Sequence, residues 1–174
     1  MTPLRSRWFL SPVAAAVVTL ASSASASAAQ DPHLRASTPE TPIASPVVVP
    51  LDPGTLASLP REPVSARVHE TTLSCEGVAL FALLRASGAV PEGALRSAQL
   101  SRYVLVDARD GYRVLFSLAE LDPGTGRRDV WLVDRCDGAA LDDKDGPLRL
   151  LVPGDARAAR SVRQVESISV VVAP

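Results

Sequence analysis

The residues Cys75-Glu-Gly-Val-Ala-Leu-Phe-Ala-Leu-Leu-Arg-Ala-Ser-Gly88 carry the clearest helical pattern of the chain. Leu80, Leu83 and Leu84 recur at the i, i+3, i+4 spacing that places side chains on one face of a helix. Gly88 follows the last of these leucines, at a position where a left-handed residue commonly ends a helix. The pattern predicts a helix over residues 78–86 that buries its leucine face.

Apolar segments rich in β-forming residues lie on both sides of this helix. Strands are expected over residues 64–68 and 72–75, paired around a turn near His69, and over 102–107, 112–116, 130–133, 148–152 and 162–172. Both faces of segment 102–107 are apolar, so we expect it at the centre of a sheet. Strands, one helix and then mostly strands predict an α+β domain with short helices and a mixed, largely antiparallel sheet.

Turn residues separate these segments. Asp110-Gly111 is a dipeptide typical of a β-hairpin between the strands at 102–107 and 112–116. Leu-Asp-Pro-Gly-Thr occurs at residues 51–55 and again at 121–125, and both copies predict a turn. Asp52 is expected to cap a helical turn over 56–59, and Ser117 to Glu120 has the spacing of a capping box.

The N-terminus has the three-part pattern of a secretory signal peptide, predicted over residues 1–29. Arg5 and Arg7 precede an apolar stretch over residues 8–20, and small residues follow to Ala29. The apolar stretch is shorter than the ~20 residues that cross a bilayer, so no membrane span is expected after cleavage. We expect a bacterial periplasmic or secreted protein, and the sequence leaves open which.

Residues 30–53 are rich in proline, and we interpret them as a semi-extended linker. The alternative is that residues 47–49, three valines in a row, add an edge strand. With the linker interpretation, the folded domain covers residues 54–174.

Composition excludes several classes of function. The formal net charge is −1, and no basic run is interleaved with aromatic residues, so nucleic acid is not an expected partner. His33, His69, Cys75 and Cys136 are the only histidines and cysteines, and their spacing matches no zinc site. Neither a Gly-x-Ser-x-Gly elbow nor a glycine-rich phosphate loop is present. We therefore assign no catalytic residue and no metal ligand.

The two cysteines allow three interpretations. A disulfide between Cys75 and Cys136 suits a small exported domain. The second interpretation is that both cysteines are buried free thiols, which pack as small apolar groups. A metal or nucleophile site formed by Cys75 with His69 is the third, although no group that would orient it can be identified.

Three blocks of the chain resemble the sulfite-oxidase-like molybdopterin-binding domain family. Residues 75–88 resemble its aromatic-x-Gly-Val-x-Leu-x-x-Leu-Leu-x-x-Ala-Gly helix entry. Asp110-Gly-Tyr-Arg-Val-Leu-Phe-Ser-Leu-Ala-Glu-Leu-Asp-Pro123 resembles the strand and turn in its middle, and residues 146–155 with 160–165 resemble its C-terminal signature. The blocks keep the family's order, so the resemblance implies this fold for nearly all of residues 54–172.

The resemblance also implies a site. Enzymes of the family hold a molybdenum–pterin cofactor with a cysteine thiolate, but the segment that carries that cysteine is missing here and Cys75 stands where the family has an aromatic residue. Ser161-Val-Arg-Gln164 matches a Ser-Val-Lys-Trp-like stretch that contacts the cofactor's phosphate and pterin. Arg157, Arg160, Ser161 and Arg163 are therefore the candidate cofactor-binding or anion-binding residues. The alternative is a solvated basic turn paired with the acidic residues Asp142, Asp143, Asp145 and Asp155.

Three functional hypotheses follow. The first is an exported, catalytically degenerate binding module that holds a small pterin-like or phosphate-like anion, or an envelope protein, without retaining molybdopterin. The second is an active molybdenum-cofactor oxidoreductase subunit, and the third is a structural protein of the cell envelope. The missing cysteine segment favours the first hypothesis over the second.

Overall fold

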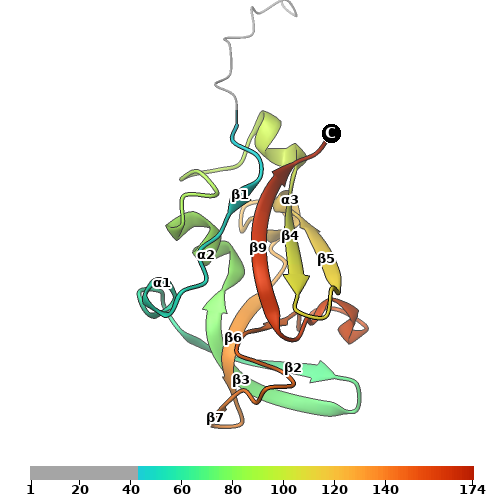
Figure 1. Ribbon diagram of the computed structural model, residues 1–174. Coiled ribbons are helices and arrows are strands. Elements are labelled where there is room, and N and C mark those ends of the chain that lie inside the picture. The colour runs from blue at the N-terminus through green and yellow to red at the C-terminus, as the bar shows by residue number, and fades with distance from the viewer. Residues whose placement is uncertain (1–42) are drawn as a thin grey trace, which may run out of the picture. The chain divides into compact units, whose positions relative to one another are not determined.

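Two antiparallel sheets make up the described part of the protein, residues 43–174 of a computed structural model (Figure 1). The first sheet has the order β1 (Val47–Val48), β9 (Val165–Val172), β4 (Arg102–Ala108) and β5 (Arg113–Ser117). The second has the order β2 (Glu62–Val68), β3 (Thr71–Ala79), β6 (Trp131–Cys136) and β7 (Ala139–Ala140), and β8 (Arg149–Leu151) also pairs with β6. The short helices are α1 (Pro53–Ala57), α2 (Leu80–Ala86), α3 (Leu118–Leu121), η1 (Ser97–Ser101) and η2 (Ala158–Arg160). The α+β prediction is confirmed, but the strands form two sheets and every pairing is antiparallel.

The predicted helix forms and buries its leucine face. Leu80, Leu83 and Leu84 have no exposed surface and pack in the larger hydrophobic core. Helix α2 begins at Leu80 rather than at residue 78, because β3 continues through Val78 and Ala79 in its pairing with β6.

Segment 102–107 lies inside the first sheet as predicted, since β4 pairs with β5 on one side and with β9 on the other. Strand β9 begins at Val165 rather than at residue 162. Gln164 has a φ of 50° and is bonded to the segment before β8, because its backbone N–H donates to the carbonyl of Asp145 at 2.9 Å. Residues 162–164 therefore leave the ladder and follow a separate path.

The edge-strand alternative, and not the linker, describes residues 47–49. Val47 and Val48 pair with β9, and the buried Val49 donates its N–H to the carbonyl of Ile168 at 2.9 Å. Pro46 and Pro50 on either side lack the N–H that a longer strand would use, so β1 stays short. The folded part of the chain thus begins before residue 54. The signal peptide predicted over residues 1–29 and the linker over 30–42 lie outside the described residues.

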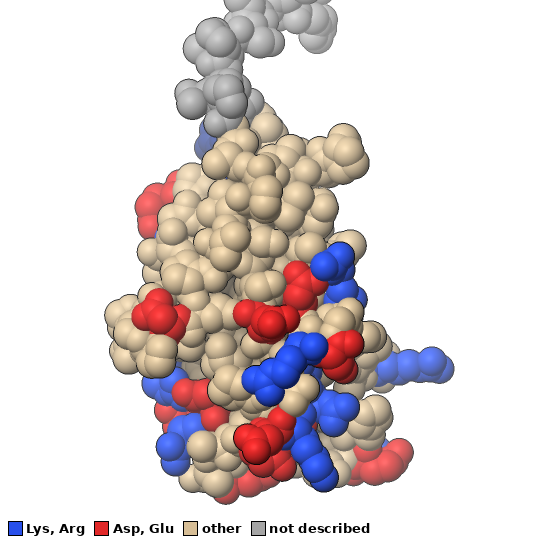
Figure 2. Space-filling view, in the orientation of Figure 1, with Lys and Arg blue, Asp and Glu red and all other residues tan. Residues whose placement is uncertain are grey.

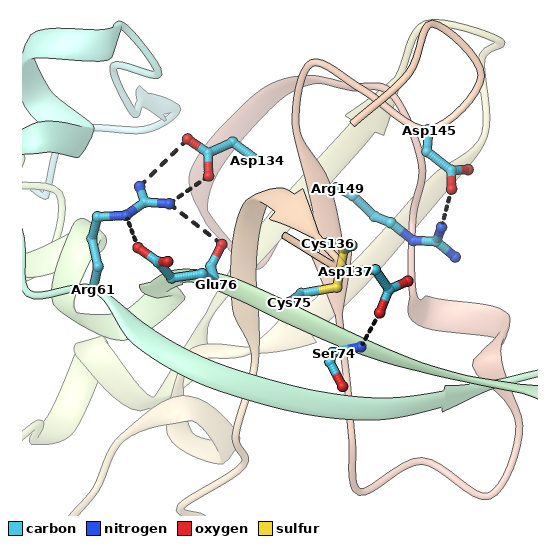
Figure 3. The surroundings of a disulfide bond; sticks show 9 residues. All are labelled: Arg61, Ser74, Cys75, Glu76, Asp134, Cys136, Asp137, Asp145 and Arg149. Carbon is cyan, nitrogen blue, oxygen red and sulfur yellow. Dashed lines mark hydrogen bonds and ion pairs between the residues drawn. A yellow bond between two sulfur atoms is a disulfide. The ribbon is translucent and has the colours of Figure 1, made fainter. Parts of the chain in front are cut away.

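Cys75 and Cys136 form a disulfide and lie directly opposite each other on β3 and β6 (Figure 3). This pairing is one of the three interpretations that the sequence allowed. It leaves neither cysteine as a free thiol.

A bulge follows this pair, because Glu76 is opposite Arg135 whereas Gly77 is opposite Val133. A Cβ atom on Gly77 would lie 2.2 Å from the carbonyl oxygen of Leu132 and 2.7 Å from Cα of Val133. The two strands can therefore approach this closely only with glycine at position 77.

We predict that Gly77→Ala destabilises the protein by roughly 1–3 kcal/mol, because backbone atoms must move to admit the methyl group. Denaturant unfolding followed by circular dichroism measures this change. Thr72→Ala, an exposed change on the same strand, is the control and should shift stability by no more than about 0.5 kcal/mol. Equal unfolding midpoints for the two variants would contradict the steric argument.

The disulfide yields a second prediction. It closes a loop between positions 61 residues apart, so its removal in the double variant C75A/C136A should lower the free energy of unfolding by about 4 kcal/mol in the chain-entropy model. Urea unfolding of the variant and of the oxidised parent gives the difference. Two reactive thiols in the unfolded, unreduced parent would show that the bond does not form.

Candidate functional site

A cleft lies between the tip of the β2–β3 hairpin and the segment that precedes β9, and we call it the hairpin-tip cleft. Its larger hollow, about 580 Å³, is bounded by Arg67 and His69 on one side and by residues 155–159 on the other. Its smaller hollow, about 250 Å³, extends to Ser161, Val162, Arg163 and the β4–β5 turn. His69, Ala158 and Ala159 line both hollows, so the two hollows adjoin each other. In the view of Figure 2, most of the charged side chains, both basic and acidic, lie in the lower half of the molecule.

His69 is brought to the middle of the cleft by the shortest possible connection between its strands. Val68 on β2 pairs with Thr71 on β3, so His69 and Glu70 alone form the turn. His69 has a φ of 55°, in the left-handed region that few non-glycine residues occupy. The predicted turn near His69 is confirmed, and it places the imidazole on the wall of both hollows.

Two hydrogen bonds hold the other walls in position. The Tyr112 hydroxyl, from the β4–β5 turn, donates to the carbonyl of Ala159 at 2.8 Å. The Ser161 hydroxyl oxygen accepts from the backbone N–H of Val152 at 3.2 Å. Because this oxygen acts as an acceptor, the Ser161 hydroxyl proton stays available to a ligand in the smaller hollow.

The Arg160 side chain forms ion pairs and lines neither hollow of the cleft. Its Nε and Nη2 donate to the two carboxylate oxygens of Asp155 at 2.8 and 2.7 Å, and its Nη1 donates to Glu120 at 3.1 Å. The guanidinium also lies 4.7 Å from the centre of the Phe116 ring. The hydrogen bond from Arg160 lowers the pKa of Asp155, and the charges of Arg160 and Arg128 act in the same direction. For Arg160, the structure thus agrees with the alternative given by the sequence, in which the basic residues pair with nearby acidic residues such as Asp155.

Arg163 lies beside a buried arginine. Arg149 on β8 is only 5% exposed along its side chain and donates to Asp145 at 2.5 Å, whereas Nη1 of Arg163 is 3.9 Å from the same carboxylate (Figure 3 shows the Arg149 bond). Burial lowers the pKa of Arg149, and the charge of Arg163 adds to this effect. One carboxylate therefore serves two guanidinium groups, and Arg163, at 3.9 Å, is the more distant of the two.

The structure brings three of the four candidate residues to one place. Arg157 lines the larger hollow, and Ser161 and Arg163 line the smaller one. The sequence offered His69 only as a turn residue or, with Cys75, as a metal or nucleophile site, and the disulfide rules out the latter because it leaves Cys75 no free thiol. The sequence did not point to Arg67 or Tyr112 at all. Their contribution depends on which hairpin tips meet, and no local pattern in the chain carries that information.

A thiolate-held molybdenum does not fit these residues. The sulfur atoms of Cys75 and Cys136 are bonded to each other, so neither presents the soft anionic ligand that such a metal requires. Cys75 borders a different hollow, together with Arg61 and Arg135. Within residues 43–174, no group of three or more His, Cys, Asp or Glu side chains is placed to hold a metal ion.

Comparison with known proteins finds no matching family model and no curated protein with significant sequence similarity. Among the helices of residues 43–174, none is long and apolar enough to span a membrane.

The ion pair of Asp155 predicts a pH dependence of stability. Because its pKa is lower in the folded state than its ordinary value of about 3.9, the pair stabilises the fold above that value and this contribution is lost as the pH falls through the folded pKa. Asp155→Asn should therefore cost roughly 1–3 kcal/mol at pH 7, and this cost should shrink as the pH falls below about 3.9.

Urea unfolding between pH 7 and pH 2 tests this. Asp129→Asn is the matched control, since Asp129 is exposed and makes no ion pair within residues 43–174. A cost for Asp155→Asn that is the same at every pH would contradict the assignment.

Proposed function

We propose that the protein is an exported binding module that holds an anionic ligand in the hairpin-tip cleft. One observation carries the proposal: Arg67 from the β2–β3 hairpin and Arg157 and Arg163 from the segment before β9 line two adjoining hollows of one cleft. Guanidinium groups offer several N–H donors in a planar fork that matches phosphate and carboxylate oxygens.

The acidic groups near the cleft compensate little of this charge. Asp155 is already bonded to Arg160 and lies 3.5 Å from Arg128. Glu70 is 3.5 Å from Arg67, but both side chains are largely exposed, and such pairs contribute little because water screens them. Asp110, which accepts from the N–H of Tyr112, is the remaining carboxylate on the wall. The cleft therefore favours a ligand that brings negative charge.

A phosphate-like or pterin-like ligand is the small-molecule class that we propose, in a catalytically inactive relative of the sulfite-oxidase-like molybdopterin-binding domain. Ser161 and Arg163, which match the family's cofactor-contact stretch, share the smaller hollow. The disulfide supports the inactive form over an active molybdenum oxidoreductase, because it consumes both sulfur atoms. No particular contact favours a purely structural envelope protein.

The disulfide also supports export. Disulfides persist in the periplasm and outside the cell and are rare in the reducing cytosol. Together with the N-terminal signal pattern, this favours a periplasmic or secreted location.

We predict that inorganic diphosphate binds to the purified protein, and that Arg157→Ala and Arg163→Ala each weaken binding about tenfold, the size of one lost charge-assisted hydrogen bond. Isothermal titration calorimetry at low salt measures the affinity. Arg96→Ala removes the same charge from an exposed position that lines neither hollow, so it should leave the affinity within about twofold. Equal affinities for the parent and the R157A/R163A double variant would refute the proposed site.

A further inference from the structure

Strand β2 is an edge strand of the second sheet. It pairs with β3 along its full length, and no strand within residues 43–174 pairs with its other side. An open edge presents backbone N–H and C=O groups that another extended chain can use.

The register shows which groups of β2 are available. Val68 and Thr71 flank a two-residue turn, so they form a hydrogen-bonded pair, and the backbone groups of every second residue back along β2 also point to β3. The N–H and C=O groups of Ser65 and Arg67 therefore point outward, away from the sheet. Pro63 has no N–H to offer, so the usable edge begins after it.

The usable edge ends at the larger hollow of the hairpin-tip cleft. Arg67 is both an edge residue and a wall of this hollow, and the opposite wall is formed by residues 155–159. Figure 1 shows the tip of β2 beneath the segment before β9. The volume of about 580 Å³ falls in the range of ~300–1,000 Å³ typical of ligand sites.

Charge selects the kind of chain that fits. A residue added opposite Arg67 directs its side chain to the same face of the sheet as Arg67. Its alternate neighbours point to the other face of the sheet, where Ala158 packs against the apolar cluster that contains Ala66 and Val68. An extended segment that alternates acidic and apolar residues matches both requirements.

We propose that the hairpin-tip cleft receives an acidic, extended peptide segment of a partner protein, which adds as a strand to the edge of β2 at Ser65 and Arg67. This inference rests on the proposed anion-binding cleft, whose arginines supply the charge, and it identifies the partner as a peptide. Main-chain hydrogen bonds to the edge supply affinity, and the arginines select acidic side chains.

The test uses the peptide Val-Glu-Val-Glu-Val-amide with a fluorescein label on its N-terminus, with anisotropy as the readout and diphosphate titration in parallel. Ser65→Pro removes the outward N–H at an edge position that tolerates proline, whereas Ser65→Ala keeps it. We expect Ser65→Pro to weaken peptide binding at least tenfold and to leave diphosphate binding unchanged, and Ser65→Ala to leave both within twofold. Arg157→Ala should weaken both ligands.

A second experiment changes the peptide and leaves the protein unaltered. Its result is therefore valid even if proline at position 65 disturbs β2. Methylation of alternate peptide nitrogens should abolish binding in one of the two alternating series and spare it in the other, because only one set of amides faces β2. Peptide binding that is unaffected by Ser65→Pro and by both series would overturn the inference. Diphosphate binding without peptide binding would overturn the inference and leave the proposed function standing, and binding of neither ligand would refute both.

Discussion

The ion pair between Asp155 and Arg160 holds the part of the molecule on which the cleft depends. Arg160 donates to both oxygens of Asp155 and to Glu120 of α3, and its plane lies over Phe116 of β5. These contacts fasten the segment before β9 to the first sheet and fix the path of the chain that carries Arg157 and Arg163. Removal of either side chain would leave the other charge, which is partly buried, without its partner. A substitution at either position should therefore lower the free energy of unfolding.

The two cysteines and the arginines of the cleft lie in different parts of the fold. The disulfide lies between β3 and β6 in the second sheet, where its sulfur atoms carry no negative charge to offer a metal. The guanidinium groups of the cleft lie elsewhere: Arg67 and Arg157 line the larger hollow, and Arg163 lines the smaller one. Arg163 also shares one carboxylate with the buried Arg149. This separation agrees with the anion-binding cleft that we propose, since its arginines are distinct from the sulfurs, which are joined in the disulfide.

A single strand register accounts for both the disulfide position and the open edge. Cys75 directs its backbone groups to Val64 on β2, so its pairing with Cys136 on the other side is of the non-hydrogen-bonded type, in which opposite residues come closest. The same alternation turns Ser65 and Arg67 outward. The two-residue turn at His69 sets this register, because no other pairing is compatible with so short a connection.

Short elements of the fold could be predicted from the residues within them and next to them. The leucine spacing predicted α2, and Asp110-Gly111 predicted the β4–β5 hairpin. Asp52 caps a helical turn as expected by accepting from the N–H of Thr55 at 3.0 Å, although this turn is α1 at Pro53–Ala57 and not residues 56–59. Ser117 precedes α3 but makes no side-chain capping bond, so the capping-box prediction was wrong. Both copies of Asp-Pro-Gly-Thr bond the threonine hydroxyl to the aspartate, at 2.7 and 2.9 Å, because that contact spans only three residues.

Tertiary structure decided what depends on distant partners. The pairing of Val47 with Val170, the choice of the disulfide over free thiols, and the division of the strands between two sheets join positions far apart in the chain. The same holds for the site, where Arg160 and Arg163 look alike in sequence but one is taken up by Asp155 and Glu120 and the other lines the cleft. Periodicity and turn residues depend on neighbours a few positions away, so they can be recognised in the sequence. The direction of an arginine side chain at the cleft depends instead on the acidic residues and hairpin turns that the two sheets place next to it.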